Sequence, residues 1–459
     1  MNIYIFGAGE NYWLYRKWFQ YHNVLGVLDN LEALWGKYID NHKIISPKKI
    51  SDSHYDRIYI VSSYVNEIRN QLIYLGVDER KIFFTFQLIS LIGHPLKNYD
   101  CYGKNYHNKS LQIVIITHEL SLTGAPMCLL YLADYFIKRG WGVTVVSPFD
   151  GELRKEFISL GIRVIIDEIL LISDNFYRDY LDECNLVVVN TVKMYYLLEN
   201  CYKKKPTIWW LHEPESLYKY VPDNAWEVLN FKKICICIVS EFAKRVFLKY
   251  SRVKNENISI LPFGIPDCKS VYDCKIINDY MEKITFVVVG EISKLKGHDV
   301  LNKAMLLLTD MSDKYRIVYI GNSQNEFANE VKKQIIRYRF PVEIKGKLAH
   351  SEVMLEIHHS NVVLCASREE SMSASIVEGM MLGKICVVTN NTGIADYIED
   401  GSNGFVCNVE DAQALSDKMR FIIENYHRLK DVGNAARYTY ETYFSINKFE
   451  KNISKILHR

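Results

Sequence analysis

The sequence predicts an α/β protein built from three doubly wound units. Short apolar runs alternate with amphipathic stretches along the whole chain, which is typical of strands alternating with helices. The length of 459 residues is too great for one ordinary hydrophobic core. An apolar fraction of 49% and a charged fraction of 24% are those of a globular protein. Together these observations indicate several packed α/β domains.

The first unit is expected over residues 1–95. A strand at Asn2–Phe6 (NIYIF), the turn Gly7-Ala8-Gly9 and a helix over Trp13–Tyr21 lead into a second strand, Val24–Leu28, which ends at Asp29. Two later strands flank a helix over 65–75, at Arg57–Ser62 and Lys81–Thr85. The polar residues 96–110 form the expected linker.

The second and third units are expected over 111–275 and 276–459. The second begins with the strand Gln112–Thr117, followed by a helix over Met127–Lys138, and its further strands are predicted at 143–147, 164–166, 186–190, 207–211 and 235–239. The third has strands predicted at 284–290, 316–320, 342–344, 362–365 and 385–389. Residues 264–281 are the expected hinge, and the tail after Asp411 is helical in pattern.

Composition excludes several classes of function. A formal net charge of +2 gives no attraction to nucleic acid. The start MNIYIFGAGE lacks the pattern of a leader peptide, and no stretch approaches the roughly 18 apolar residues that a spanning helix needs. The 11 cysteines are scattered without a paired spacing, so we expect free thiols in a reducing, cytoplasmic compartment.

Two glutamates eight positions apart, Glu370 and Glu378, follow an expected buried strand, Asn361–Ala366. Small residues between them let backbone amides approach a ligand, and a helix N-terminus favours electronegative groups. Glu370 is placed to bind hydroxyls at the mouth of the loop, and Glu378, about two turns into the helix, to bind a ribose. Spacing alone is weak evidence, because exposed helix glutamates are common.

A lysine follows the first strand of the third unit. The run VVVGEISKLKGHDVL places Lys296 and Gly297 where the next helix begins. Ligands of doubly wound sheets bind beyond the carboxyl ends of the strands, so a lysine there can pair with a diphosphate. The alternative is a solvated lysine.

These motifs resemble those of the retaining glycosyltransferases of family 4, which have the B-type fold of two facing Rossmann-like domains. The resemblance is carried by WLHEP, GEISKLKG and EESMSASIVEGMMLGKICVVTNNTGIADYIEDGSNGFV, and it covers about residues 111–459. It implies that Glu370 contacts the donor sugar, that Glu378 binds the nucleotide ribose, and that Lys296 neutralises the diphosphate.

The resemblance also implies roles in the second unit. His212 resembles the histidine that lines the cleft beside the reacting carbon, and Gly124 in LTGAP resembles the glycine loop that admits the donor phosphate or the acceptor. The catalytic residues are then His212 and Glu370. The donor-binding residues are Lys296, Gly297, Ser371, Met372, Ser373, Glu378 and Gly124.

Three positions depart from the family pattern. Glu291 stands where many members carry an arginine that pairs with the diphosphate, and a carboxylate pointing inward there would weaken donor binding. Thr123 replaces a usual second glycine, and Phe263 replaces a usual asparagine. We expect the Glu291 side chain to point elsewhere.

The implied reaction is transfer of a sugar from a nucleotide-diphosphate-sugar to an acceptor hydroxyl with retention at the anomeric carbon. Lys296, the amides of residues 371–373 and a helix N-terminus would stabilise the leaving diphosphate. The sequence has no D-x-D triplet that holds a metal under a sugar nucleotide, so we expect metal independence and no cofactor. The acceptor is expected to be a saccharide or a lipid-linked saccharide.

The first unit carries part of a dinucleotide-binding fingerprint. Gly7, Gly9 and Asp29 match it, whereas Tyr12 replaces the third glycine. The unit resembles small Rossmann modules attached to sugar-modifying enzymes, some of which bind sugar nucleotides. Two interpretations remain open: a docking domain without a ligand, and a module that acts on or senses sugar nucleotides, which would make the chain bifunctional.

The basic stretch Glu241–Lys254 has a second interpretation as well. It alternates apolar with basic residues and can lie on an anionic membrane surface, where a lipid-linked acceptor would be found. A helix whose apolar face packs in the core is the alternative.

The sequence therefore predicts a retaining glycosyltransferase of bacterial surface polysaccharide or glycoconjugate assembly. Its expected place is the cytoplasm, with a peripheral position at the inner face of the cell membrane left open. The alternative is a binding partner for nucleotide sugars that has no turnover.

Overall fold

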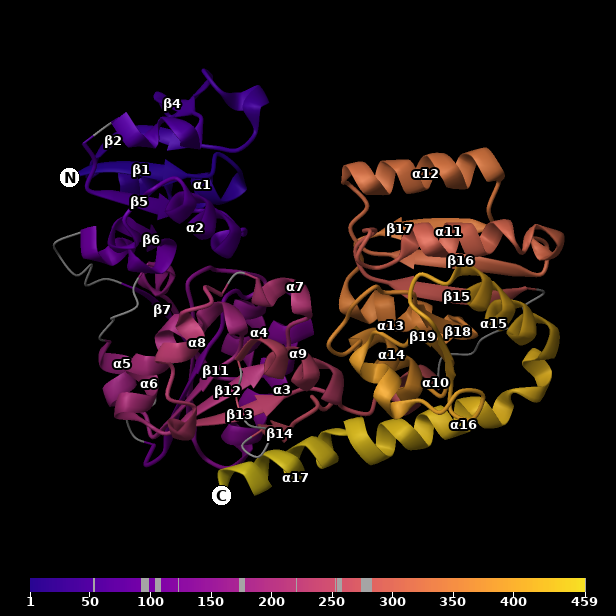
Figure 1. Cartoon of the computed structure of the whole chain (residues 1–459). Coiled ribbons are helices and arrows are strands. Elements are labelled where there is room, and N and C mark those ends of the chain that lie inside the picture. Colours follow the sequence, from indigo (N-terminus) through magenta and orange to yellow (C-terminus); the bar gives the residue numbers. More distant parts are fainter. Residues whose placement is uncertain are drawn as a thin grey trace. The chain divides into compact units, whose positions relative to one another are not determined.

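The computed structural model describes residues 1–52, 54–91, 99–103, 109–122, 124–172, 178–219, 221–251, 253, 258–273 and 283–458. The chain forms two compact units (Figure 1). The first contains residues 1–236 and 247–257, and the second contains 237–246 and 258–459. Three sheets form the framework of the protein, and all three are mostly or wholly parallel, which confirms the predicted α/β class.

The N-terminal module holds a six-stranded sheet in the order β3-β4-β2-β1-β5-β6. Its strands are β1 (Asn2–Phe6), β2 (Asn23–Leu28), β3 (Tyr38–Ile39), β4 (His42–Ile45), β5 (Arg57–Ile60) and β6 (Ile82–Phe84). Its helices are α1 (Glu10–Phe19) and α2 (Val65–Tyr74). The chain runs from β1 to β2 and β4 on one side and returns to β5 on the other, so the order reverses between β1 and β5.

The second sheet has eight strands in the order β14-β13-β12-β11-β8-β9-β10-β7. They are β7 (Asp100–Tyr102), β8 (Gln112–Ile116), β9 (Gly142–Ser147), β10 (Arg163–Ile166), β11 (Leu186–Val189), β12 (Thr207–Leu211), β13 (Ile234–Ile238) and β14 (Ile258–Ile260). The helices are α3 (Gly124–Lys138), α4 (Leu153–Ser159), α5 (Asp179–Asp182), α6 (Leu198–Lys204), α7 (Glu215–Tyr218), α8 (Ala225–Val228) and α9 (Glu241–Ser251).

Strand β7 lies inside the segment that we expected to be a linker. It pairs antiparallel with the edge strand β10, and Cys101 stands opposite Ile165. Polar composition alone did not reveal this strand, because an edge strand needs only backbone partners on one side. Residues 96–98 and 104–108 of the expected linker lie outside the described residues.

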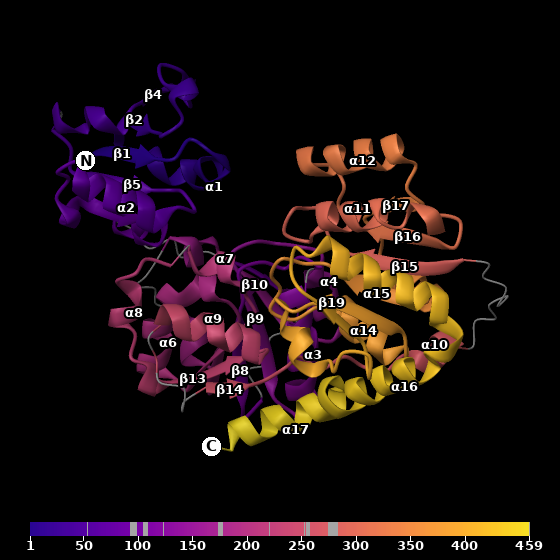
Figure 2. The same ribbon diagram turned by 45° about the vertical axis from the view of Figure 1, so that its right-hand side comes forward.

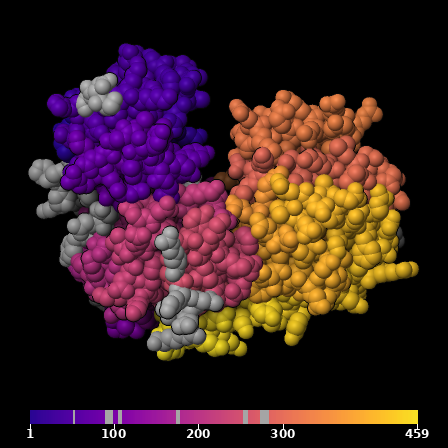
Figure 3. All heavy atoms as spheres, viewed as in Figure 1, coloured from indigo at the N-terminus to yellow at the C-terminus, as the bar shows by residue number. Residues whose placement is uncertain are grey.

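The module and the second sheet share a hydrophobic cluster within the first unit. Leu171, Ile172 and Phe149 pack with residues of the module such as Ile5, Tyr12 and Trp18. Phe86 stacks on Tyr196 with ring centroids 5.0 Å apart. Figure 3 shows the indigo spheres of the module adjoining the rest of this unit.

Helix α9 resolves the two interpretations of the basic stretch. Phe242, Val246 and Phe247 are buried, and the Phe247 ring contacts the rings of Trp209 and Trp226. The apolar face is therefore packed in the protein and is not available to a membrane surface. Within the described part of the chain, none of the helices has the length and hydropathy to cross a bilayer.

The third sheet is wholly parallel, in the order β17-β16-β15-β18-β19-β20 (Figure 2). Its strands are β15 (Ile284–Val289), β16 (Tyr315–Ile320), β17 (Val342–Gly346), β18 (Val362–Cys365), β19 (Ile385–Thr389) and β20 (Phe405–Cys407). Helices α11 (His298–Leu306), α12 (Glu326–Tyr338) and α15 (Ala412–Asn425) share one apolar cluster with it. The other helices are α10 (Lys269–Asp273), α13 (His350–His359), α14 (Ala374–Met381), α16 (Lys430–Thr439) and α17 (Ile446–Leu457).

Candidate functional site

The order of the third sheet reverses between β15 and β18, and the loops after these two strands carry the predicted donor residues. Lys296 lies in the loop between β15 and α11, and Glu370 lies in the loop between β18 and α14. The Lys296 Nζ and Glu370 Oε2 atoms are 2.9 Å apart. The ion pair therefore forms at the switch point, where open α/β sheets bind their ligands.

Two glycines allow the loops to meet. Gly297 has a left-handed φ of 71°, and a Cβ atom there would lie 2.0 Å from the carbonyl oxygen of Ala366. A Cβ atom at Gly393 would lie 1.8 Å from the carbonyl oxygen of Ser371. Glycine is therefore required at both positions, and the close approach of backbone holds Lys296 beside Glu370.

Burial and charge oppose each other at Lys296. Burial by itself would lower the pKa of the ammonium, but the Glu370 carboxylate raises the pKa above its usual value. Glu370 also accepts a hydrogen bond from the Ser367 hydroxyl at 3.0 Å. Burial raises the pKa of Cys365 to about 11, so this thiol stays protonated and serves as a neutral neighbour.

Glu378 lies on α14 and is paired with a histidine. His350 Nε2 and Glu378 Oε1 are 2.7 Å apart, and this hydrogen bond raises the pKa of His350. Helix α14 begins at Ala374, so Glu378 lies about one turn into it and the predicted two turns were wrong. The helix starts later than the small residues suggested, because Ser373 is its N-cap in an extended conformation.

Residues 371–373 form the segment before this helix. Ser371, Met372 and Ser373 are all buried. The Ser371 carbonyl accepts a hydrogen bond from the Ser240 hydroxyl at 2.7 Å, whereas the buried Ser371 Oγ has no partner among the described residues. The Ser373 hydroxyl contacts Ser375 Oγ and does not cap the helix, so its first amides remain for a ligand.

Arg368 is a residue of this region that the sequence analysis missed. Its guanidinium makes two bonds of 2.9 Å to the Asp299 carboxylate and one of 2.7 Å to Glu410. Its backbone amide donates to the Leu295 carbonyl at 2.7 Å. Arg368 therefore ties the Lys296 loop and α11 to the loop after β18. Its place after a buried strand was the available signal, but its partners lie far away in sequence.

Glu291 is held by two amide side chains. Asn322 Nδ2 and Asn325 Nδ2 donate to its Oε1 atom at 3.2 Å and 3.1 Å. These asparagines follow β16 and precede α12, so the carboxylate is engaged with that loop.

His212 lies directly after β12, a strand of the second sheet. Its Nε2 atom is buried and has no partner among the described residues. Burial, with a smaller effect of His118, lowers the pKa of His212 to about 3. His118, which follows β8, has a pKa lowered to about 4, mainly by burial. Both imidazoles are thus neutral near pH 7, and His212 can exchange a hydrogen bond with a ligand. The sequence analysis missed His118.

Gly124 is the first residue of α3, the helix that follows β8 of the second sheet. A Cβ atom there would meet nothing within 4 Å. The glycine leaves the start of this helix uncovered. Thr123, the departure noted beside it, lies outside the described residues.

Gly7, Gly9 and Asp29 meet in the N-terminal module. Asp29 follows β2, and its carboxylate accepts the Ala8 amide at 2.9 Å and the Leu31 amide at 2.8 Å. Gly7 has a φ of 118° and comes close to Val61 of the neighbouring strand. Asp29 thus joins the turn after β1 to the end of β2.

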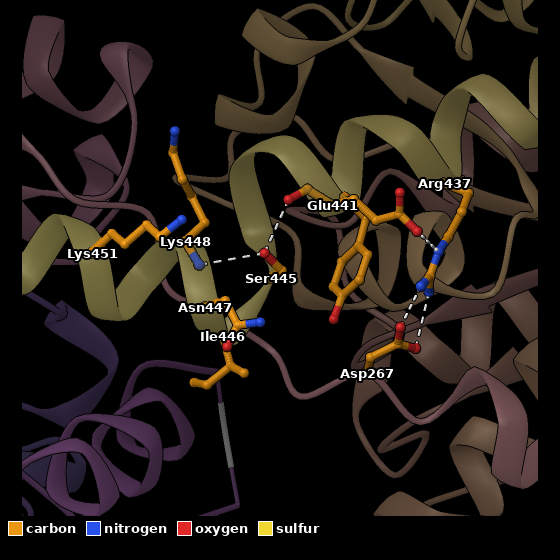
Figure 4. Close-up of a pocket in the computed structure, with 9 residues that line it drawn as sticks. Asp267, Arg437, Glu441, Ser445, Ile446, Asn447, Lys448 and Lys451 are labelled. Atoms are coloured by element: carbon orange, nitrogen blue, oxygen red, sulfur yellow. Dashed lines mark hydrogen bonds and ion pairs between the residues drawn. The ribbon is translucent and has the colours of Figure 1, made fainter.

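A further cavity of about 370 Å³ lies beside the C-terminal helices (Figure 4). Arg437 binds Asp267 and Glu441 at its wall. None of the predicted site residues lines this cavity. The Arg437 pairs tie the segment before α10 to α16 and the following turn.

Family models match three parts of the chain. Residues 1–83 match "C2185-like, N-terminal", residues 109–262 match "Glycosyl-transferase family 4", and residues 274–439 match "Glycosyl transferases group 1". The last two cover the second and third sheets.

Curated relatives match about half of the chain. The 2-deoxystreptamine N-acetyl-D-glucosaminyltransferase of Niallia circulans is 24% identical over 49% of this chain and 62% of its own. The capsular polysaccharide biosynthesis glycosyltransferase CapM of Staphylococcus aureus is 22% identical over 46% of this chain and 57% of its own. Both matches span less than two thirds of the relative.

Solved structures match a larger share. Anabaena Alr3699/HepE in complex with UDP and glucose superposes with a TM-score of 0.65 and 17% identity, covering 76% of this chain and 99% of that one. The sucrose-phosphate synthase of Thermosynechococcus elongatus has a TM-score of 0.60 and 15% identity, covering 76% and 98%. This likeness shows the B-type fold, and the two glycosyltransferase models, which together match residues 109–262 and 274–439, identify the chain as a family 4 glycosyltransferase with an additional N-terminal domain.

Proposed function

We propose that this protein transfers a sugar from a nucleotide-diphosphate-sugar to a hydroxyl of a saccharide or lipid-linked saccharide, with retention at the anomeric carbon. The likeness to a capsular polysaccharide glycosyltransferase supports a role in bacterial surface polysaccharide or glycoconjugate assembly. The HepE structure contains UDP and glucose, so UDP-glucose is the first donor to test.

The ion pair between Lys296 and Glu370 carries this proposal. The leaving diphosphate gains negative charge while the sugar becomes oxocarbenium-like, so the main task of the site is to stabilise opposite charges. The Lys296 ammonium and the Glu370 carboxylate, 2.9 Å apart at the switch point, supply a positive charge for the diphosphate and a negative charge for the sugar. In the proposed complex Lys296 turns to the diphosphate, and Glu370 accepts hydrogen bonds from sugar hydroxyls.

Glu378 is proposed to bind the ribose. A carboxylate has about four lone-pair positions, so the bond to His350 leaves capacity for the two hydroxyls of a ribose. The bond also fixes the rotamer of Glu378, which reduces the entropy lost on binding.

His212 is proposed to act beside the reacting carbon. Its Nε2 atom is buried and meets no partner in the described part of the chain, and its lowered pKa keeps the ring neutral. A neutral imidazole can hydrogen-bond the donor sugar or the acceptor without placing a positive charge near the oxocarbenium-like carbon.

We also propose that transfer needs no metal ion. Lys296 and the amides at the start of α14 provide positive charge and dipoles that can replace one. Turnover should persist in a chelator. Loss of turnover in the chelator and recovery on adding a divalent metal would contradict this part of the proposal.

The decisive experiment compares two lysines of one loop. Lys296→Ala removes the cation of the pair, whereas Lys294→Ala removes an exposed lysine two positions away. We expect Lys296→Ala to lower kcat for release of UDP from UDP-sugars by about 10²–10³, the loss typical for one electrostatic contact to a developing charge. Lys294→Ala should behave like wild type.

Donor binding is measured separately, as the change in melting temperature that UDP-sugars cause in the wild type and in Glu378→Ala. Binding to the folded state raises the melting temperature. Stabilisation that disappears in Glu378→Ala supports the donor site. A folded wild type that no UDP-sugar or other nucleotide sugar stabilises would favour a role without turnover.

A further inference from the structure

The N-terminal module contains a cavity of about 750 Å³. It opens at the carboxyl ends of three strands. It is lined by Phe6 and Gly7 at the end of β1, by Asp29 to Leu31 after β2 and by Val61 to Ser63 after β5. The order of the sheet reverses between β1 and β5, so the cavity lies at the switch point of the sheet. Open parallel sheets bind ligands at this place.

The lining of this cavity is acidic. It contains the carboxylates of Glu10, Asp29 and Glu67, together with serine, tyrosine and asparagine side chains. The residues described at its wall include no lysine or arginine. Carboxylates accept hydrogen bonds from hydroxyl groups, but they repel phosphates.

The start of α1 strengthens this conclusion. Glu10 is the first residue of the helix and already places a negative charge where a phosphate would bind. Tyr12, which replaces the third glycine of the fingerprint, is almost completely buried. A diphosphate is therefore disfavoured in this cavity, and an uncharged ligand rich in hydroxyls is favoured.

Gly9 leaves the cavity open. Its φ is −87°, which any residue can adopt, and a Cβ atom there would meet nothing within 4 Å. The protein itself therefore does not require glycine at this position. The missing side chain exposes the backbone of the turn to whatever occupies the cavity.

A second cavity of about 250 Å³ adjoins the first. Both are lined by Asn11, Val61 and Ser62. The second cavity extends to His118, which follows β8, and to Lys193, which follows β11. Its wall is aromatic, with Tyr15, Phe84, Phe86, Phe149, Tyr195 and Tyr196. Apolar and aromatic walls with a few polar groups are typical of small-molecule sites.

The second cavity extends to the sheet whose strand β12 precedes His212. His118 follows β8 and His212 follows β12, and only β11 separates these two parallel strands in the sheet, so both imidazoles lie at the same edge of the sheet. The cavity of the module thus adjoins an aromatic cavity that reaches His118, at the sheet edge that also carries His212.

We propose that the N-terminal module binds the part of a saccharide acceptor that lies away from its reacting hydroxyl, as uncharged sugar units held by Glu10, Asp29 and Glu67. This inference rests on the proposed function, which assigns His212 to the reacting centre. It gives the additional domain a role in the choice of acceptor, separate from the donor residues Lys296, Glu370 and Glu378.

The test uses the full chain on a printed array of defined, uncharged oligosaccharides. Gly9→Leu fills the cavity without a backbone clash, and Glu67→Gln removes one carboxylate. Tyr74→Ala is the control, because Tyr74 lies on the same helix as Glu67, is 91% exposed and lines neither cavity. We expect wild type and Tyr74→Ala to bind the same glycans and Gly9→Leu to bind them at least about tenfold more weakly.

The donor shift is measured on the same samples. Gly9→Leu should keep its stabilisation by a UDP-sugar, so that loss of glycan binding alone identifies the module. Glycan binding that is unchanged in Gly9→Leu, or an array on which the wild type binds nothing, would overturn the inference. Competition of the glycan by inorganic phosphate would overturn it too. Loss of the donor shift in wild type would instead contradict the proposed function.

Discussion

The charged side chains proposed to bind the donor are paired in the absence of a ligand. Lys296 faces Glu370, and Glu378 faces His350. The sequence could place the two glutamates and the lysine after their strands, because strand and helix patterns are local. It could not reveal His350 or Arg368, because their partners are 28 and 69 positions away and nothing local marks them. The assignment of roles to these residues stays a prediction.

His212 makes stability depend on pH. Its pKa is about 3 in the folded protein and about 6.5 in an unfolded chain, so below about pH 6.5 the unfolded chain binds a proton that the folded protein does not. Stability therefore falls as the pH falls from about 6.5 toward 3. At pH 5 the penalty from this residue reaches about 2 kcal/mol.

The measurement is urea unfolding of the wild type and of His212→Asn, followed by tryptophan fluorescence between pH 7 and pH 5. We expect the wild type to lose more stability than the variant over this range, because only the wild type carries the His212 imidazole that must stay unprotonated in the folded protein. Equal losses in the two proteins would show that His212 is solvated or paired.

At the scale of elements, glycine turns position the loops. Gly297 and Gly346 both have left-handed φ values, 71° and 70°, but a Cβ atom meets the Ala366 carbonyl only at Gly297. Gly346→Ala should cost about 1–2 kcal/mol for the left-handed backbone alone. Gly297→Ala should cost more, since the loop must also shift.

The two variants are compared by melting temperature and by stabilisation with a UDP-sugar. Gly346→Ala should keep the donor response. Gly297→Ala should lose it, because the shift moves Lys296 away from Glu370. A full donor response in Gly297→Ala would show that the loop adapts without affecting the site.

The elements themselves followed the apolar pattern closely. The first strand, Asn2–Phe6, has the predicted limits. Strand β9 (Gly142–Ser147) begins one residue before its predicted start and ends at its predicted end. The start of α14 and strand β7 were not foreseen, because caps and edge strands depend on backbone partners more than on the pattern of side chains. The predicted domain limits stay a prediction.

At the scale of the molecule, the alternation of strands and helices was enough to predict the fold class. It could not show that Leu171 and Ile172 pack against the module, because an apolar pattern says that a residue is buried but not what covers it. A chain shortened to begin at residue 99 should therefore expose these side chains and Phe149.

We expect the shortened chain to melt at a lower temperature and to aggregate more readily than the full chain, as measured by light scattering during heating. Replacing Leu171 and Ile172 by serine in the shortened chain should reduce the aggregation. A shortened chain as stable and as soluble as the full protein would contradict the role of this cluster.

The ion pair between Lys296 and Glu370 also bears on how a turnover ends. While an intact donor is bound, the diphosphate occupies the lysine and the sugar hydroxyls occupy the glutamate. Once the sugar has left, Glu370 has lost its ligand and can compete for Lys296 against the remaining diphosphate. The resting pair thus promotes departure of the spent nucleotide, and Glu370→Gln should strengthen product inhibition by UDP.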